Sequence, residues 1–375
     1  MDLIENRRFN FFYFAFFIIL VISKVMGLDN KKFIFILLTF FALIHLIIKI
    51  LNDKYNIRQF MMIVLLILLG GIIFLYSKKP TVLISIVAIV FAKNISFDKL
   101  IKLVFNVRLI GFILVVSACL TGAIDNIKSY RLLDNGEILT RYSLGFSHPN
   151  TAYLNFFILV LLYLYIYFDK VRWVNYMVII IISQIMYTIT GSRTGYIIAV
   201  LSMFITCILK HKKLRNNKII KIMIQITPII CALVSILGGI LYDSSNILFK
   251  TMDNLLSGRI QLSNRFLNTY SIKPFGQVII EGGDINGSYL RIDNGYVALL
   301  LGYGFFIFIL YIVFQTLILK KYIREFKYKE ILLIIIFSIY GITEVYIYNA
   351  FINISLLFMS DLLYSNNKRA IKYKI

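Results

Sequence analysis

One short stretch, "MYTITGSRTGYIIAV" at 187–201, carries a cation between two apolar runs. The turn itself follows from Gly191 and Gly195, because glycine ends helices and permits positive φ. Arg193 needs another reason, since its guanidinium lies close to hydrocarbon, where charge is costly and usually serves a function. One planar guanidinium can bind two oxygens of the same phosphate at once. Arg193, with Ser192 beside it, is therefore a candidate anion-binding residue.

A second group of polar residues stands in "TRYSLGFSHPNTAYLN" at 140–155, where Arg141 precedes His148 by seven positions. The proline after the histidine is typical of a first helical position, and Asn150 or Thr151 is expected to cap the helix. An imidazole here could also accept a proton from a substrate. An ordinary helix start with an incidental histidine explains the same residues, and both interpretations stay open.

Two further arginines, Arg259 and Arg265, fall in a long polar stretch, and Asp293 and Asn294 follow it directly before another apolar run. The arginines fit either a binding role or a solvated helical face. Asp293 or Asn294 is an ordinary N-cap at this position.

A carboxylate stands alone in a later apolar segment, Glu344 in "GITEVYIYNAF". Its position predicts a partnership with an arginine, either within a site or as a simple salt bridge between helices. Together, several arginines with His148, Asp293 and Glu344 as proton-handling groups indicate a site for an anionic headgroup, best a lipid diphosphate. No metal-ligand spacing, P-loop or dinucleotide fingerprint is present in the sequence.

The elements that must position these residues are apolar helices. The chain has 375 residues, is 60% hydrophobic and 15% charged, and has a mean hydropathy of +0.83. Apolar runs near twenty residues recur throughout, which predicts an all-α polytopic membrane protein of about twelve spans. We expect these near 9–27, 33–51, 60–76, 81–92, 106–124, 150–168, 174–190, 195–209, 222–242, 295–319, 331–348 and 349–364. The fourth is short and the last two are joined by almost no loop, so a re-entrant or interfacial segment at either place is the open alternative and would change the count. The first is expected to remain as an uncleaved anchor.

Basic residues cluster in alternate gaps, so the positive-inside rule places both termini in the cytoplasm. The turn at 191–195, the loops 125–149 and 243–293 and the junction near 348–349 are then outside. The net charge of +22 follows from this topology and does not indicate nucleic-acid binding. The three cysteines lie within apolar runs and show neither a disulfide nor a metal pattern.

Several motifs resemble, in order, those of the bacterial O-antigen and capsule repeat-unit polymerases (Wzy-type), which belong with the O-antigen ligases. They are "RYSLGFSHPNTAYLNFFIL", "TGSRTGYIIAVL", "LSGR", "KPFGQ", "DNGYVALLLGYG" and the late Glu344. The order matches from about residue 105 to residue 365. One departure is Asp293, which precedes Asn294 where many relatives carry a histidine.

The resemblance implies a single polytopic membrane domain over 1–375, similar to GT-C-type glycosyltransferases, with loops 125–149 and 243–293 contributing the active site. It implies polymerisation of undecaprenyl-diphosphate-linked oligosaccharides at the outer face of the cytoplasmic (inner) membrane, without a metal or another cofactor. Membrane lipid surrounds the protein, and a chain-length regulator and a flippase are the implied protein partners. The product would be an O-antigen, capsule or exopolysaccharide.

The resemblance also implies residue roles. Arg193 and Arg141 would bind the diphosphate and stabilise its departure, with Arg259 next. His148 is the first choice for the general base, and Asp293 is the second. The remaining expected substrate-binding residues are Arg265, Asn150, Ser192, Asn294 and Glu344.

Two other functions remain open. A ligase would move finished glycan onto a different acceptor by the same chemistry. A flippase or other transporter of lipid-linked glycans would also have about twelve spans. A transporter of charged headgroups should carry cations near the membrane midplane. The expected spans place few lysines or arginines there, which favours an enzyme.

Overall fold

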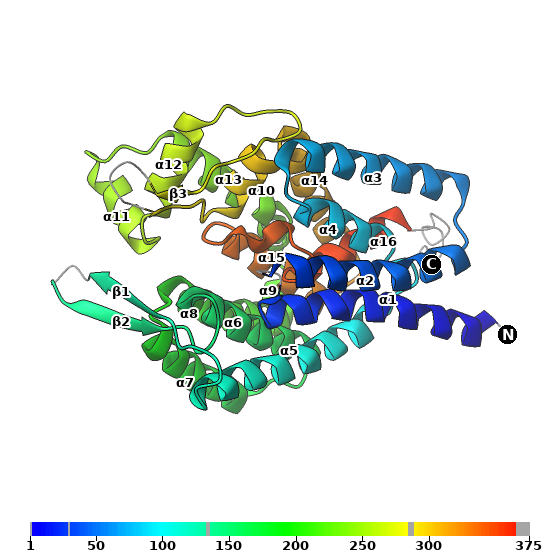
Figure 1. Cartoon of the computed structure of the whole chain (residues 1–375), viewed down its shortest axis with the longest axis horizontal. Helices are drawn as coiled ribbons and strands as arrows, with labels where there is room; N and C mark the ends of the chain where they lie inside the picture. Colours follow the sequence, from blue (N-terminus) through cyan, green and yellow to red (C-terminus); the bar gives the residue numbers. More distant parts are fainter. Residues whose placement is uncertain (1, 29–30, 133–135, 284–288, 365–375) are drawn as a thin grey trace. The chain divides into compact units, whose positions relative to one another are not determined.

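The computed structural model of the protein describes residues 2–28, 31–132, 136–283 and 289–364. Helices dominate this part of the chain (Figure 1). Within it, eight helices are long and apolar enough to cross a membrane: α2 (Lys32–Asn52), α3 (Ile57–Ser77), α5 (Phe97–Leu120), α6 (Pro149–Ile166), α7 (Trp173–Thr190), α8 (Arg193–Lys210), α10 (Lys218–Ile240) and α14 (Phe305–Arg324). The chain is therefore a helical, multi-pass membrane protein.

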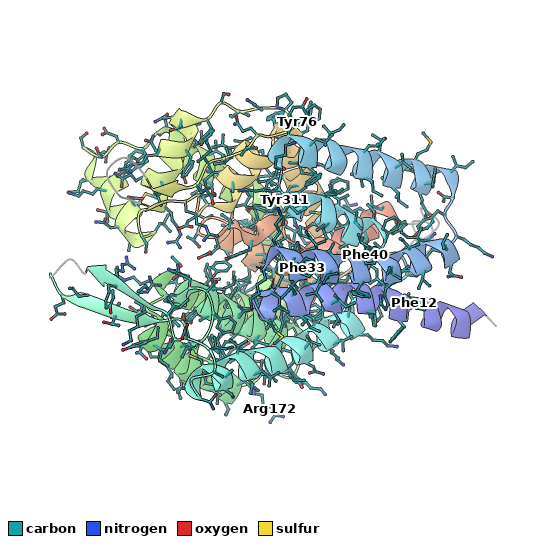
Figure 2. All side chains as sticks on the ribbon, in the orientation of Figure 1. Phe12, Phe33, Phe40, Tyr76, Arg172 and Tyr311 are labelled. Atoms are coloured by element: carbon teal, nitrogen blue, oxygen red, sulfur yellow. The ribbon has the colours of Figure 1, made fainter. Side chains whose placement is uncertain are left out.

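The surfaces of several of these helices are apolar. Phe33 and Phe40 on α2 (Figure 2) are 73% and 60% exposed. Leu65 on α3 is 66% exposed. Exposing this much apolar side-chain surface to water is unfavourable, whereas lipid tails solvate it well.

The helices agree with the first nine expected spans to within a few residues, except that α1 (Asp2–Val25) and α5 begin several residues earlier. The agreement has a local cause, because each apolar run satisfies its backbone hydrogen bonds within itself only as a helix. α4 (Thr81–Val90) is as short as expected. The total of twelve spans stays a prediction.

The chain divides into two compact units. Unit 1 comprises residues 1–51, 95–224 and 326–340, and unit 2 comprises residues 52–94, 225–325 and 341–375. Both units are assembled from segments far apart in the sequence.

α6 is the central helix of unit 1, and 78% of its residues are buried inside the protein. It packs against α5, α7, α8 and α15 (Tyr328–Tyr340) (Figure 1). A proline occupies its first turn, as expected, but its N-cap is His148 rather than Asn150 or Thr151. The short helix α9 (Lys212–Asn216) follows α8.

A hairpin of two strands precedes α6, which the all-helical expectation missed. β1 (Lys128–Leu132) and β2 (Ile138–Tyr142) are antiparallel, and Ser129 lies opposite Arg141. Polar groups close the hairpin at its base: the Ile127 N–H donates to Ser143 Oγ at 2.9 Å. The hairpin forms by pairing across a turn, which helix-period reasoning does not detect.

Unit 2 contains shorter and less regular elements. Besides α3, α4, α14 and most of α10, they are α11 (Ile247–Leu255), α12 (Arg259–Thr269), β3 (Gly282–Gly283), β4 (Tyr289–Leu290), α13 (Gly295–Ala298), η2 (Leu299–Tyr303), η3 (Val345–Tyr348), η4 (Ile354–Met359) and α16 (Ser360–Leu363). β3 and β4 pair antiparallel.

The expected span at 295–319 is not one continuous helix, because the helix breaks at Gly304 and the membrane-length helix α14 begins only at Phe305. A π-turn, η2, precedes the break, and Gly304 has φ +101°. The loop at 273–277 packs against this point: a Cβ on Gly304 would lie 2.3 Å from the nitrogen of Gly276. The Phe305 N–H donates to the Lys273 carbonyl at 2.9 Å. At the break, backbone N–H groups at the start of α14 therefore bond to carbonyls of the loop 273–277 instead of to carbonyls of a preceding helical turn.

The last two expected spans, 331–348 and 349–364, also differ from the structure. α15 ends at Tyr340, and the chain continues through turns and the 3₁₀ helices η3 and η4. Residues 349–360 are all buried. Their polar groups are paired within the protein, for example Asn353 Nδ2 with the Ile347 carbonyl at 2.8 Å. Irregular backbone is tolerated at membrane depth only when protein buries it in this way.

Candidate functional site

The clearest cluster of expected site residues lies in unit 1, where Arg141 meets the turn between α7 and α8. Arg141 Nε donates to the Thr190 carbonyl at 2.8 Å, and Arg141 Nη2 donates to Asn150 Oδ1. The hairpin supplies Arg141, α6 supplies Asn150 and α7 supplies Thr190. Two directed bonds from one planar group fix the orientation of the guanidinium.

Gly191 explains how Arg141 comes so close. It is the C-cap of α7 with φ +59°, a left-handed conformation that favours glycine. A Cβ at this position would lie 3.0 Å from both Cγ and Nε of Arg141. The glycine therefore ends the helix and also provides space for the arginine side chain.

Gly195 has a different role in the same turn. A Cβ on Gly195 would lie 2.3 Å from Cδ1 of Tyr153, a fully buried residue of α6. This glycine allows the start of α8 to pack directly on α6. The two glycines thus fix the turn against two neighbouring elements.

Arg193 and Ser192 begin α8. Ser192 is the N-cap, is 4% exposed and makes no side-chain cap hydrogen bond. Arg193 is half-buried, and within the described residues no hydrogen bond or ion pair holds its guanidinium. The helix N-terminus adds a partial positive charge at the same point. Cationic character therefore concentrates at this turn.

His148 has a structural task in this cluster. Its Nδ1 accepts a hydrogen bond from the Asn150 N–H at 3.1 Å and so caps α6. In a neutral imidazole whose Nδ1 accepts, the proton sits on Nε2. Proton abstraction by His148 would therefore require the cap bond to open. The cap also holds the backbone of Asn150, the partner of Arg141.

A second cluster lies in unit 2, around Arg259 and Glu344. Arg259 is 6% exposed, and its Nη2 lies 3.3 Å from Glu344 Oε1. Its Nε donates to the Thr343 carbonyl at 2.7 Å and its Nη1 to the Leu256 carbonyl at 3.1 Å. The expected partnership of Glu344 with an arginine is confirmed. All three nitrogens of this guanidinium bind protein groups, which makes Arg259 a structural residue.

Asp293 and Asn294 lie beside this ion pair. Of the two expected candidates, Asn294 is the N-cap of α13, and its Oδ1 accepts from the N–H groups of Tyr296 and Val297. The charges of Asp293 and Arg291 lie near enough to act on the Glu344 carboxylate. Ionisable groups from distant chain segments, among them Asp293 and Glu344, therefore lie close together at the N-terminal end of α13.

Arg265 does not join either cluster through the contacts of the described residues. It is exposed on α12, six positions after Arg259. Six residues of helix rotate a side chain by about 240°. Arg265 therefore faces a different side of α12 from Arg259.

Sequence reasoning missed Arg108. Because α5 begins at Phe97, Arg108 lies in the middle of this helix, where it is 2% exposed. Its Nη1 donates to Asn155 Oδ1 at 3.2 Å, and Asn155 Nδ2 donates to the Thr151 carbonyl at 3.0 Å. Arg108 is therefore an exception to the expectation that the middle of the spans carries few cations. The early start of α5 was not visible because its first residues are polar.

Asp253 was also missed. It is 6% exposed, and its Oδ1 accepts from the N–H groups of Ile260 and Gln261 at 2.8 and 3.0 Å. The carboxylate thereby caps α12 from outside that helix. Asp253 lies in α11, within the stretch 243–293 that was expected to be a loop, so no residue pattern indicated this cap.

Among the described residues, no group of three or more histidine, cysteine or carboxylate side chains comes together to hold a metal ion. The cysteines Cys119, Cys207 and Cys231 are free thiols. The chemistry these clusters offer is anion binding by arginine and proton transfer by carboxylate or imidazole.

Comparison with protein-family models, with curated proteins and with solved structures gave no match for this chain.

Proposed function

We propose that the protein polymerises lipid-diphosphate-linked oligosaccharide repeat units by glycosyl transfer, with undecaprenyl diphosphate as the lipid carrier. The observation that carries the proposal is the cluster in unit 1. Arg141 is oriented by Thr190 and Asn150 and packs on Gly191, two residues before Arg193. This arrangement fits a diphosphate, which two arginines and a helix N-terminus can bind together.

The reaction needs charge stabilisation and a base. A hydroxyl oxygen of one repeat unit attacks the anomeric carbon of the growing glycan, and the bond from that carbon to the diphosphate breaks. The diphosphate leaves with the electron pair, so negative charge develops where Arg141 and Arg193 would lie. Oriented donors in a site of low dielectric stabilise such charge strongly.

The proton of the attacking hydroxyl passes to a carboxylate or imidazole base. We assign this role to Asp293, because the Nδ1 of His148 is already engaged as a helix cap. His148 then acts as a positioning residue through Asn150. Arg259 and Asn294 are assigned to the architecture of unit 2, since their polar atoms bind protein groups.

We place the reaction at the outer face of the cytoplasmic membrane, with both termini inside. The basic gaps between the apolar runs support this orientation. Partners in such a pathway would include a flippase that delivers the repeat units and a regulator of chain length.

Purified full-length protein incubated with lipid-linked repeat unit alone tests the proposal. A ladder of products that differ by one repeat unit is the expected result. A product that forms only after a different acceptor is added would instead identify a ligase. Movement of the intact lipid-linked glycan across vesicles without new glycosidic bonds would identify a transporter.

His148→Asn and Asp293→Asn separate the cap from the base. Asparagine is an effective N-cap, so His148→Asn should retain ladder formation to within a few-fold. Asp293→Asn removes the proton acceptor and should lower the rate about 100-fold, the scale of general base catalysis. The measurement is the initial rate of repeat-unit addition, with circular dichroism as the control for folding. The reverse result would return the base role to His148.

A further inference from the structure

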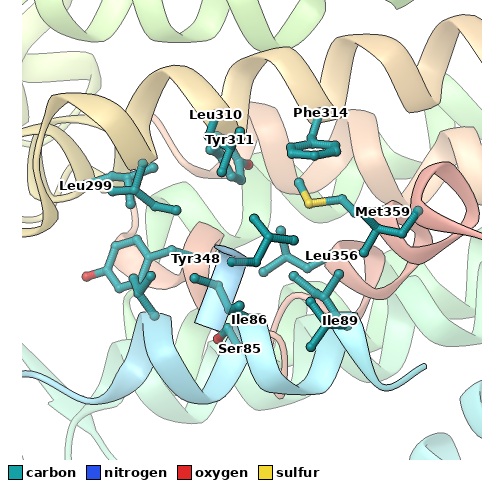
Figure 3. A pocket seen from close by; sticks show the side chains of 15 residues that line it. Ser85, Ile86, Ile89, Leu299, Leu310, Tyr311, Phe314, Tyr348, Leu356 and Met359 are labelled. Carbon is teal, nitrogen blue, oxygen red and sulfur yellow. The ribbon is translucent and has the colours of Figure 1, made fainter. Parts of the chain in front are cut away.

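Unit 2 contains an apolar pocket that the proposed chemistry does not use. It holds about 580 Å³ of space, its opening included, and none of the described residues that line it is charged. α4 forms one wall, and α14 with η4 forms the other (Figure 3). The lining residues of α4 extend from Val82 to Val90, about 12 Å of helix at 1.5 Å per residue. This length accommodates a stretch of hydrocarbon chain.

A polar pocket adjoins it. This second pocket holds about 450 Å³ of space, its opening included, and Lys79, Arg291 and Glu281 are the charged residues that line it. Tyr348 lines both pockets, and its ring centroid lies 4.8 Å from that of Tyr303. The apolar and the polar space therefore meet at one aromatic pair.

The order of the two pockets along α4 matches the order of a lipid in a bilayer. Lys79 stands two residues before α4 begins, and the apolar lining follows along the helix itself. A cation just before the helix start indicates the headgroup level, and the ten residues of α4 that follow, eight of them apolar, are suited to hydrocarbon depth.

The charge of the polar pocket distinguishes between lipid classes. Its lining offers two cations and one carboxylate, so it complements a single negative charge. The carboxylate of Glu281 would repel the additional charge of a diphosphate. The Arg141–Arg193 cluster in unit 1, with two arginines, suits the diphosphate better.

We propose that unit 2 binds one monoanionic phospholipid of the surrounding bilayer, with its phosphodiester between Lys79 and Arg291 and an acyl chain in the apolar pocket. The bound lipid would fill the space between α4, α14 and η4 and hold these elements together. The site does not depend on the proposed glycosyl transfer, and a separate experiment tests it.

Native mass spectrometry of the full-length protein tests the site. The detergent-solubilised protein is mixed with equal amounts of phosphatidylglycerol and phosphatidylcholine, and the lipid that stays bound is identified. One phosphatidylglycerol per chain should be retained in preference. The double variant Lys79→Gln/Arg291→Gln should lower its retention about tenfold, equivalent to about 1.4 kcal/mol. Lys78→Gln, next to Lys79 but outside both pockets, is the matched control and should retain the lipid as the wild type does.

A second variant tests the part of the site that binds the acyl chain. Ile86→Trp would fill the apolar pocket and should displace the lipid while both headgroup cations remain. If this variant does not fold, the headgroup variant is sufficient to test the proposal, because Lys79 and Arg291 are exposed and their replacement should not disturb folding.

Equal retention of the two phospholipids by the wild type would overturn the proposal, and so would unchanged retention of phosphatidylglycerol by the Lys79→Gln/Arg291→Gln variant. Displacement of phosphatidylglycerol by an equal amount of undecaprenyl diphosphate would also overturn it and assign the pocket to the substrate.

Discussion

Arg141→Ala and Arg193→Ala should each lower the rate of repeat-unit addition about 10²–10³-fold, the loss expected for one oriented donor at a developing negative charge. Arg141 is the more informative position, because the structure fixes its guanidinium through the Thr190 carbonyl and Asn150. Arg141→Lys keeps the charge but cannot make both bonds in one plane, so it should recover only part of the lost rate. The measurement is ladder formation by purified protein at saturating lipid-linked repeat unit.

Arg131→Ala is the matched control for this experiment. Arg131 lies in the same hairpin, opposite Leu139, and carries the same charge. Its loss should change the rate by no more than a few-fold if the effect at Arg141 comes from position rather than from net charge. Wild-type rates in both the Arg141→Ala and the Arg193→Ala protein would contradict the diphosphate site. An equal loss in all three variants would indicate a general electrostatic effect instead.

Arg259→Ala should destabilise unit 2 by about 3–5 kcal/mol, the usual result of removing one partner from a buried ion pair. The change leaves Glu344, which is 12% exposed, without its countercharge. It also leaves the carbonyls of Thr343 and Leu256 without their side-chain donors. Thermal and denaturant unfolding of the full-length protein in detergent would measure the loss.

Two further variants locate the origin of that loss. Glu344→Gln retains an acceptor for Arg259 while removing the charge, so the double variant Arg259→Met/Glu344→Gln should be more stable than Arg259→Ala. Arg265→Ala changes an exposed arginine of the same helix and should cost less than about 0.5 kcal/mol. Similar stability of the Arg259→Ala and Arg265→Ala proteins would show that the ion pair does not stabilise unit 2.

The sequence alone determined those features whose causes lie within a few residues. The apolar runs specified most of the helices, because a chain in hydrocarbon must satisfy its hydrogen bonds internally. The proline at the start of α6, the cap of α13 by Asn294 and the turn with Gly191 likewise depend on local backbone preferences. Each was therefore predictable from residue type and neighbours.

Only the tertiary structure decided which of these features meet. Arg141 and Thr190 are 49 positions apart, and Arg259 and Glu344 are 85 apart, so no local pattern indicates that they touch. The same holds for the break at Gly304, where the backbone of Gly276 replaces helical contacts. Such contacts depend on how whole elements pack. Packing also changed the assigned roles: it bound Arg259 within the protein and made His148 a cap, while Arg193 kept an open guanidinium at the turn.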